Sequence, residues 1–200
     1  MASFNEHLKF LGQFLKLGRR IATPCVSPRA LAIAACKCVD AHTVQTIVEL
    51  GAGTGAITKV IIETMHPQST LVCIEINAEL GSYLKKYSKN AHIVICDVTQ
   101  TEEVFCDLKL DKVDVVISSL PFRNLPPQST AAIIRFFCKF SRSNNARFCQ
   151  ITIIPWMYKK VYQLIFKNVE SQLVWKSIPP GEVYICSEVQ EDFETHLPSG

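Results

Sequence analysis

The sequence predicts an α/β fold, in which a mostly parallel sheet carries helices on both faces and one antiparallel strand at its edge. Two observations lead to this prediction. Short apolar runs that suit buried strands alternate along the chain with stretches of helical periodicity. One such run, beginning at Thr46, leads directly into a glycine-rich turn and then a helix, as in the crevice of an open α/β sheet.

Length and composition fit one domain with small additions at its ends. The chain has 200 residues, of which 48% are hydrophobic, which is ample for a single core. We expect amphipathic and capping helices in residues 1–40, a ligand-binding domain in 41–190 and a frayed acidic tail in 191–200. No apolar run approaches the ~20 residues that a membrane-spanning helix needs.

The cysteines predict a reduced, cytoplasmic protein without a metal site. There are nine of them, an odd number, and the two closest, Cys36 and Cys38, do not form a CxxC pair. Several others fall in predicted strands, where a free thiol behaves as a small apolar side chain. The five histidines are scattered, so no metal-ligand spacing recurs.

Residues 3–18 predict an amphipathic helix, because Phe4, Leu8, Leu11 and Leu15 recur at helical spacing. The first 20 residues also hold the whole net charge of +3, so the remaining chain has none. Such a helix can lie in an anionic membrane interface or pack over the edge of the sheet, and both interpretations stay open. The neutral remainder argues against nucleic acid as a partner.

The other elements follow in order from periodicity and from turn residues. A helix over 28–39 begins at a Ser-Pro pair, which suits a helix start. β-Branched and other apolar runs predict strands over 70–75, 92–96, 112–118 and 147–153. The amphipathic segments between and after them predict helices over 78–87, 102–108, 128–140 and 157–166. A final pair of strands, over 172–177 and 182–187, flanks a Pro-Pro-Gly turn.

The glycine turn is the strongest candidate for a binding site. Alternate glycines at Gly51, Gly53 and Gly55 allow a sharp turn and a close approach of a ligand to the backbone. The spacing also fits a loose dinucleotide fingerprint, with Glu75 at the expected distance downstream. Glu49, however, would repel a pyrophosphate and would face a cationic or amino-bearing ligand. A tight turn without any ligand is the remaining alternative.

The block Glu49-Leu50-Gly51-x-Gly53-x-Gly55 resembles the first motif of class I methyltransferases, which have a Rossmann-like sheet and bind S-adenosylmethionine (SAM). The resemblance implies that Glu75 accepts the ribose hydroxyls and that Ile76 packs on the adenine. It also implies that Asp97 accepts from the adenine amino group beside the amide of Val98. The expected cofactor set is completed by Glu49, Gly51, Ala52, Gly53, Gly55 and Ser118.

Three further segments resemble the bacterial phosphatidylethanolamine N-methyltransferase (phospholipid methyltransferase) family, over about residues 8–187. They are Phe14-Leu15 with Pro28-Arg29-Ala30, the block Leu120-Pro-Phe-Arg-Asn-Leu-Pro126, and Ile178-Pro-Pro-Gly-Glu-Val-Tyr184. The resemblance implies methyl transfer to a phospholipid amine by an enzyme peripheral to the inner face of the membrane. The chain departs from the usual family residues at Ser119, which leaves another small amine open as the acceptor.

For catalysis we expect the carbonyls of Ser118 and Leu120 to orient the hydrogens of the amine, and Phe122 to form an apolar wall. Tyr184 is either a polar contact to the headgroup or a structural strand tyrosine. Arg123 meets a phosphate or stays solvated. No side chain stands out as a general base.

Three alternatives remain at this stage. An rRNA adenine N6-dimethyltransferase shares the glycine motif and has an Asn-Leu-Pro-Tyr block, where this chain has Ser119 and Phe122. A SAM-binding module without turnover would share the turn alone. A dehydrogenase is the weakest, because nothing after residue 118 suggests a hydride-acceptor domain. The sequence leaves the oligomeric state open.

Overall fold

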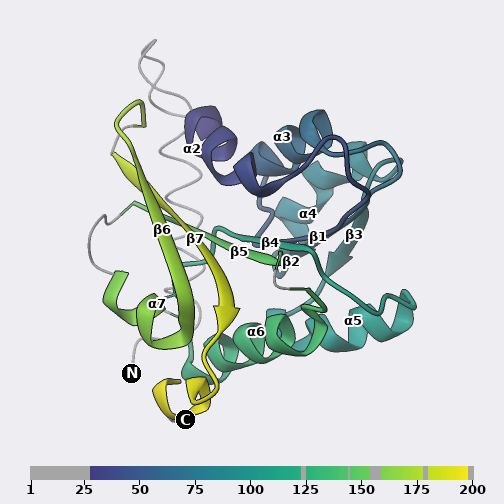
Figure 1. Ribbon diagram of the computed structural model, residues 1–200. Helices are drawn as coiled ribbons and strands as arrows, with labels where there is room; N and C mark the ends of the chain where they lie inside the picture. The colour runs from purple at the N-terminus through teal and green to yellow at the C-terminus, as the bar shows by residue number, and fades with distance from the viewer. Residues whose placement is uncertain (1–27, 123–124, 144, 154–158, 178–179, 198–200) are drawn as a thin grey trace.

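A computed structural model of the chain describes residues 28–122, 125–143, 145–153, 159–177 and 180–197 (Figure 1). The helix expected over residues 3–18 lies outside these ranges, so both interpretations of it stay predictions. Arg123 and the first residues of the Ile178–Tyr184 motif lie outside them as well.

The described residues form a seven-stranded sheet in the order β3-β2-β1-β4-β5-β7-β6. Strands β1 to β5 are mutually parallel, and β7 runs antiparallel to both of its neighbours. The strand order reverses between β1 and β4, and the carboxyl ends of these two strands are where an open α/β sheet binds its ligand. The strands are β1 (Thr46–Leu50), β2 (Thr70–Glu75), β3 (His92–Ile95), β4 (Val115–Ser118), β5 (Arg147–Thr152), β6 (Phe166–Val174) and β7 (Gly181–Val189).

Two layers of helices cover the sheet (Figure 1). One face packs against α2 (Pro28–Ala35), α3 (Ala56–Thr64) and α4 (Ala78–Leu84). The other face packs against α5 (Thr101–Asp107), α6 (Pro127–Phe140) and α7 (Lys159–Ile165). The central strand β1 is buried along its whole length, which explains why it reads as an uninterrupted apolar run around Glu49.

The predicted fold class is therefore confirmed, and most expected elements occur near their expected positions. The clearest difference is β6, which was expected to begin at Gln172 but already begins at Phe166, directly after α7. This strand borders the sheet, and it exposes polar side chains such as Lys167, Asn168 and Glu170. A border strand needs little apolar surface, so its sequence does not show the periodicity of a buried one.

The acidic tail was expected to be frayed, and for its described part this was wrong. The short 3-10 turn η5 (Phe193–His196) is tied to α6 by Arg135, which donates to both carboxylate oxygens of Glu194 at 2.8 and 2.6 Å. Leu197 packs into the core of the α5–α6–α7 face. An acid that looked like solvated tail charge is thus one half of a bidentate ion pair.

Candidate functional site

The glycine turn lies at the carboxyl end of β1, at the switch point of the sheet. All three glycines adopt the left-handed backbone, with φ values of 77°, 56° and 86° at Gly51, Gly53 and Gly55. The amides of Gly51 and Ala52 both donate to the carbonyl of Ile74, at 2.9 and 3.2 Å. The turn is therefore fastened to β2, the strand that carries Glu75.

Gly51 brings the turn into contact with the block that follows β4. A Cβ atom at Gly51 would lie 2.7 Å from Cδ2 of Leu120, closer than carbon atoms approach in proteins. The hydroxyl of Ser119 also donates to the carbonyl of Gly51 at 2.8 Å. Two motifs that are far apart in the sequence therefore form one surface, and glycine at position 51 is what permits it.

Glu75 is buried at the end of β2 and is held by the turn itself. Its Oε2 accepts from the amide of Gly53 at 2.8 Å, and its Oε1 accepts from the amide of Asn77 at 2.9 Å. Each carboxylate oxygen can accept more than one hydrogen bond. Both oxygens can therefore also accept from a pair of ligand hydroxyls.

Glu49 is fully buried beneath α3 and has one oxygen without a partner. Its Oε2 accepts from the hydroxyl of Thr58 at 2.6 Å and from the thiol of Cys73 at 3.4 Å, while Oε1 accepts no hydrogen bond. Burial raises the pKa of Glu49 to about 7, the charge of Glu75 adds to the rise, and the hydrogen bonds oppose it. Such an orphaned acceptor fits a ligand that brings a cationic or N–H donor group.

Asp97 has a structural task in addition to the expected one. Its Oδ1 accepts from both the amide and the hydroxyl of Thr99, each at 2.8 Å, and so caps the 3-10 turn η3 (Val98–Gln100). Val98, which follows β3, is buried, and Ile76, which follows the neighbouring strand β2, is half-buried. Contact of these three residues with an adenine stays a prediction.

The block after β4 differs from expectation at Leu120. Its carbonyl accepts from the amide of Phe122 at 2.9 Å and from Nε2 of Gln150 at 2.8 Å, so both lone pairs are in use. In this structure the Leu120 carbonyl is therefore not available to orient a substrate amine. Ser118 is fully buried at the end of β4, and its hydroxyl accepts from the Leu120 amide at 3.3 Å.

Tyr184, for which a headgroup contact and a structural strand tyrosine were the two alternatives, is completely buried in the structure. Its hydroxyl donates to Oε2 of Glu182 at 2.6 Å, and its ring lies 5.2 Å from that of Tyr162. This geometry corresponds to the structural strand tyrosine of the sequence analysis. Burial follows from the position of β7, which lies inside the sheet between β5 and β6 and is covered by α7.

Sequence reasoning missed Gln150, Thr58 and Asn77, which hold the expected site residues in place. Gln150 had a visible signal, because it is a long polar side chain in the middle of the apolar strand β5. Asn77 had one as well, because it is the N-cap of α4 and an asparagine directly before a helical stretch is a helix-start signal. Thr58 had none, since helix residues with short polar side chains occur throughout the chain.

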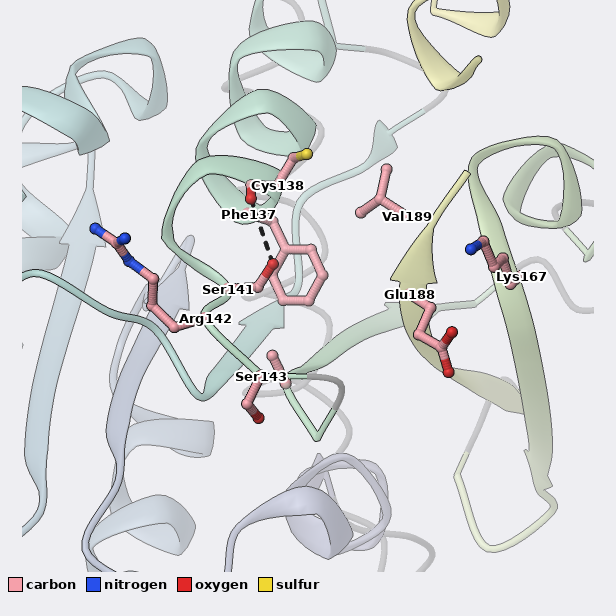
Figure 2. A pocket seen from close by; sticks show the side chains of 9 residues that line it. Phe137, Cys138, Ser141, Arg142, Ser143, Lys167, Glu188 and Val189 are labelled. Atoms are coloured by element: carbon pink, nitrogen blue, oxygen red, sulfur yellow. Dashed lines mark hydrogen bonds between the residues drawn. The ribbon is translucent and has the colours of Figure 1, made fainter. Parts of the chain in front are cut away.

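A separate hollow of about 250 Å³ lies at the opposite end of the strands from the glycine turn (Figure 2). Phe137 and Cys138 from the end of α6 line one side, and Lys167, Glu188 and Val189 from the β6–β7 pair line the other. Ala146, just before β5, places this hollow at the amino ends of the parallel strands, away from the glycine turn. Within the described ranges no group of histidine, cysteine and acidic side chains could hold a metal ion.

Comparison with known proteins gives a consistent family and fold. Residues 34–147 match the family described as the methyltransferase small domain. The chain is 30% identical over 187 residues to the ornithine lipid N-methyltransferase of Singulisphaera acidiphila, which covers 92% of this chain and 97% of that protein.

Two solved structures share the fold at low identity. Human methyltransferase-like protein 13 in complex with SAH has a TM-score of 0.60 at 11% identity, over 88% of this chain and 95% of that one. Magnesium protoporphyrin IX methyltransferase from Synechocystis PCC 6803 with bound SAM has a TM-score of 0.58 at 10% identity, over 94% and 99%.

Proposed function

The chain belongs to the methyltransferase small domain family, and from this premise we propose that it is a SAM-dependent N-methyltransferase acting on the primary amine of a lipid headgroup. The observation that carries the lipid assignment is the relative named ornithine lipid N-methyltransferase, which matches over nearly the full length of both chains. Phosphatidylethanolamine and an ornithine-type amino lipid both present such an amine. They differ in the phosphate, which only the former carries.

The described residues fit the proposed cofactor. Glu75 presents two acceptor oxygens for the ribose hydroxyls, and Glu49 presents an unpartnered oxygen for a donor of the amino-acid portion. Ile76, Asp97 and the Val98 amide follow at the next strand ends, where the adenine is expected. Bound SAM supplies a methyl group that is already activated by its sulfonium.

The protein therefore has to bind, orient and shield the two reactants. Ser118 and Leu120 lie where the block after β4 meets the glycine turn, so an amine held there is next to the cofactor cradle. Holding two reactants in line can lower a barrier by several kcal/mol. Phe122 is half-buried and its ring packs edge-on against Phe148 at 5.8 Å, which gives this wall an apolar surface.

We further propose that the protein works at a membrane surface, through the basic amphipathic segment over residues 3–18. A lipid headgroup can reach the cradle only if the enzyme approaches the bilayer. Among the described helices, none has the length and apolar character to cross a membrane.

The test uses the purified full-length chain, labelled SAM and vesicles that contain either phosphatidylethanolamine or an ornithine lipid. The proposal expects labelled mono- and dimethylated lipid from at least one vesicle type, and much less product from Glu75→Ala when SAM is limiting. Transfer to ribosomal RNA but to neither lipid would favour the adenine dimethyltransferase alternative. SAM binding without any labelled product would favour the alternative of a SAM-binding module without turnover.

A further inference from the structure

Gln150 is a buried carboxamide at the junction of the two site motifs. It is 2% exposed, it pairs with Ser118 across β4 and β5, and it pairs with Tyr184 across β5 and β7. Its neighbours along β5, Phe148 and Cys149, are fully buried apolar residues. Burying a carboxamide in such a strand costs free energy unless its polar atoms find partners.

Only one end of this carboxamide has partners. Nε2 donates to the carbonyl of Leu120 at 2.8 Å and to that of Ile151 at 2.9 Å. Because both partners are acceptors, they fix which end of the amide carries the hydrogens. Oε1 is therefore directed away from them, and it is buried without a hydrogen-bond partner. A buried acceptor in this state requires an explanation, and a donor that arrives with a ligand is one that fits a position beside the cofactor cradle.

The position of Gln150 narrows the choice of that donor. Its partner Leu120 lies directly over Gly51, so the carboxamide is one residue removed from the cofactor cradle. The N–H groups of SAM already have candidate acceptors at the ends of other strands, in Glu49 and Asp97. Of the two carbonyls expected to accept from the acceptor amine, that of Leu120 is saturated, so the amine keeps only the Ser118 carbonyl and has room for a second acceptor.

We propose that Gln150 positions the acceptor amine: its Nε2 holds the Leu120 segment against the glycine turn, and its Oε1 accepts a hydrogen bond from the amine that is methylated. This inference rests on the proposed function and adds a residue to it that recognises the substrate. It predicts selectivity, because a neutral primary amine carries two N–H donors and its protonated form three, whereas a fully methylated headgroup carries none. Gln150 would therefore bind the unmethylated headgroup and release the trimethylated one.

The test measures binding and so does not depend on turnover. The full chain is saturated with S-adenosylhomocysteine and titrated with two short-chain lipids that differ only in a primary amine or a trimethylammonium headgroup. We expect wild type to prefer the primary amine about tenfold or more. We expect Gln150→Leu to lose that preference by weakening the primary amine about tenfold and the trimethylated lipid less than twofold.

Controls separate this role from a structural one. Gln163→Leu, at an exposed position of α7, should retain the wild-type preference. Gln150→Met offers an unbranched replacement if the leucine does not fold, and SAM affinity should stay within about twofold in each folded variant. Equal losses for both lipids, a loss of SAM affinity instead, or a wild type without any preference would each overturn the inference. Failure of wild type to methylate any lipid amine would instead remove the proposed function itself.

Discussion

The amide of Gly53 donates a 2.8 Å hydrogen bond to Oε2 of Glu75, so the glycine turn and the acid after the next strand hold each other. The second oxygen of Glu75 is held from the other side by the amide of Asn77. A carboxylate fixed in this way loses little rotamer freedom when a ligand arrives, which favours binding.

Glu75→Ala should weaken SAM binding roughly 10- to 100-fold, because hydrogen bonds to a charged group contribute about 1.5–3 kcal/mol. Glu75→Gln should also weaken it, since the NH2 group of the glutamine would face the backbone amide of either Gly53 or Asn77 with donor against donor. Isothermal titration calorimetry measures both. Glu79→Gln, at an exposed acid in the first turn of α4, is the matched control and should bind as wild type does. Full affinity in Glu75→Ala would remove the ribose assignment.

Gly51→Ala should destabilise the protein through two separable effects. The left-handed backbone costs a residue with a Cβ about 1–2 kcal/mol, and the contact with Leu120 adds an overpacking cost of about 1–3 kcal/mol. In a Leu120→Ala background the second cost should disappear, and only the first should remain. Urea unfolding of wild type, the two single variants and the double variant measures both costs in a double-mutant cycle. An equal cost of Gly51→Ala in both backgrounds would contradict the contact.

Glu49 should make the stability of the cofactor-free protein depend on pH. Burial raises its folded pKa from 4.5 to about 7, so the folded protein holds the Glu49 proton more tightly than the unfolded chain does. The stability that follows from this protonation is fully present below pH 4.5 and is lost as pH rises through 7. Relative to Glu49→Gln, wild type should lose on the order of 3 kcal/mol of unfolding free energy across this window. Urea unfolding at pH 5 and pH 8 gives the comparison, in which other titrating groups cancel. Parallel profiles for the two proteins would be the opposite result.

Removal of residues 1–18 should weaken binding to anionic vesicles, and most strongly at low salt. The segment carries basic residues whose attraction to lipid headgroups is screened over about 10 Å at 0.1 M salt. Vesicle co-sedimentation across a salt series measures the effect. A variant with Lys9 and Lys16 changed to glutamine should lose the low-salt part of the binding but keep the apolar part. Unchanged binding after truncation would show that the segment packs on the domain instead.

The fold could be predicted because its signals are local. Each parallel strand is an apolar run, and the turn after β1 carries glycines at the three positions where the backbone is left-handed. The start of β6 at Phe166 was missed because a border strand with exposed Lys167 and Glu170 resembles a polar linker. The docked tail was missed because the Arg135–Glu194 pair joins residues 59 positions apart.

The site could be predicted as a set of strand ends but not as a set of contacts. The positions of Glu49, Glu75 and Ser118 follow from the strand boundaries alone. The use of the Leu120 carbonyl does not, because backbone acceptors carry no side-chain signal and their partner, Gln150, comes from another strand. The two alternatives for Tyr184 could not be separated for a similar reason, since its burial depends on β7 lying inside the sheet.

The docked turn η5 has a practical use. It follows β7, whose Val189 end lies across the sheet from the Gly181 end that borders the glycine-turn side. A fluorophore attached at exposed Thr195 would thus be carried on the far side of the molecule. Encounters with vesicles could then be followed optically while the face that receives the lipid stays unlabelled.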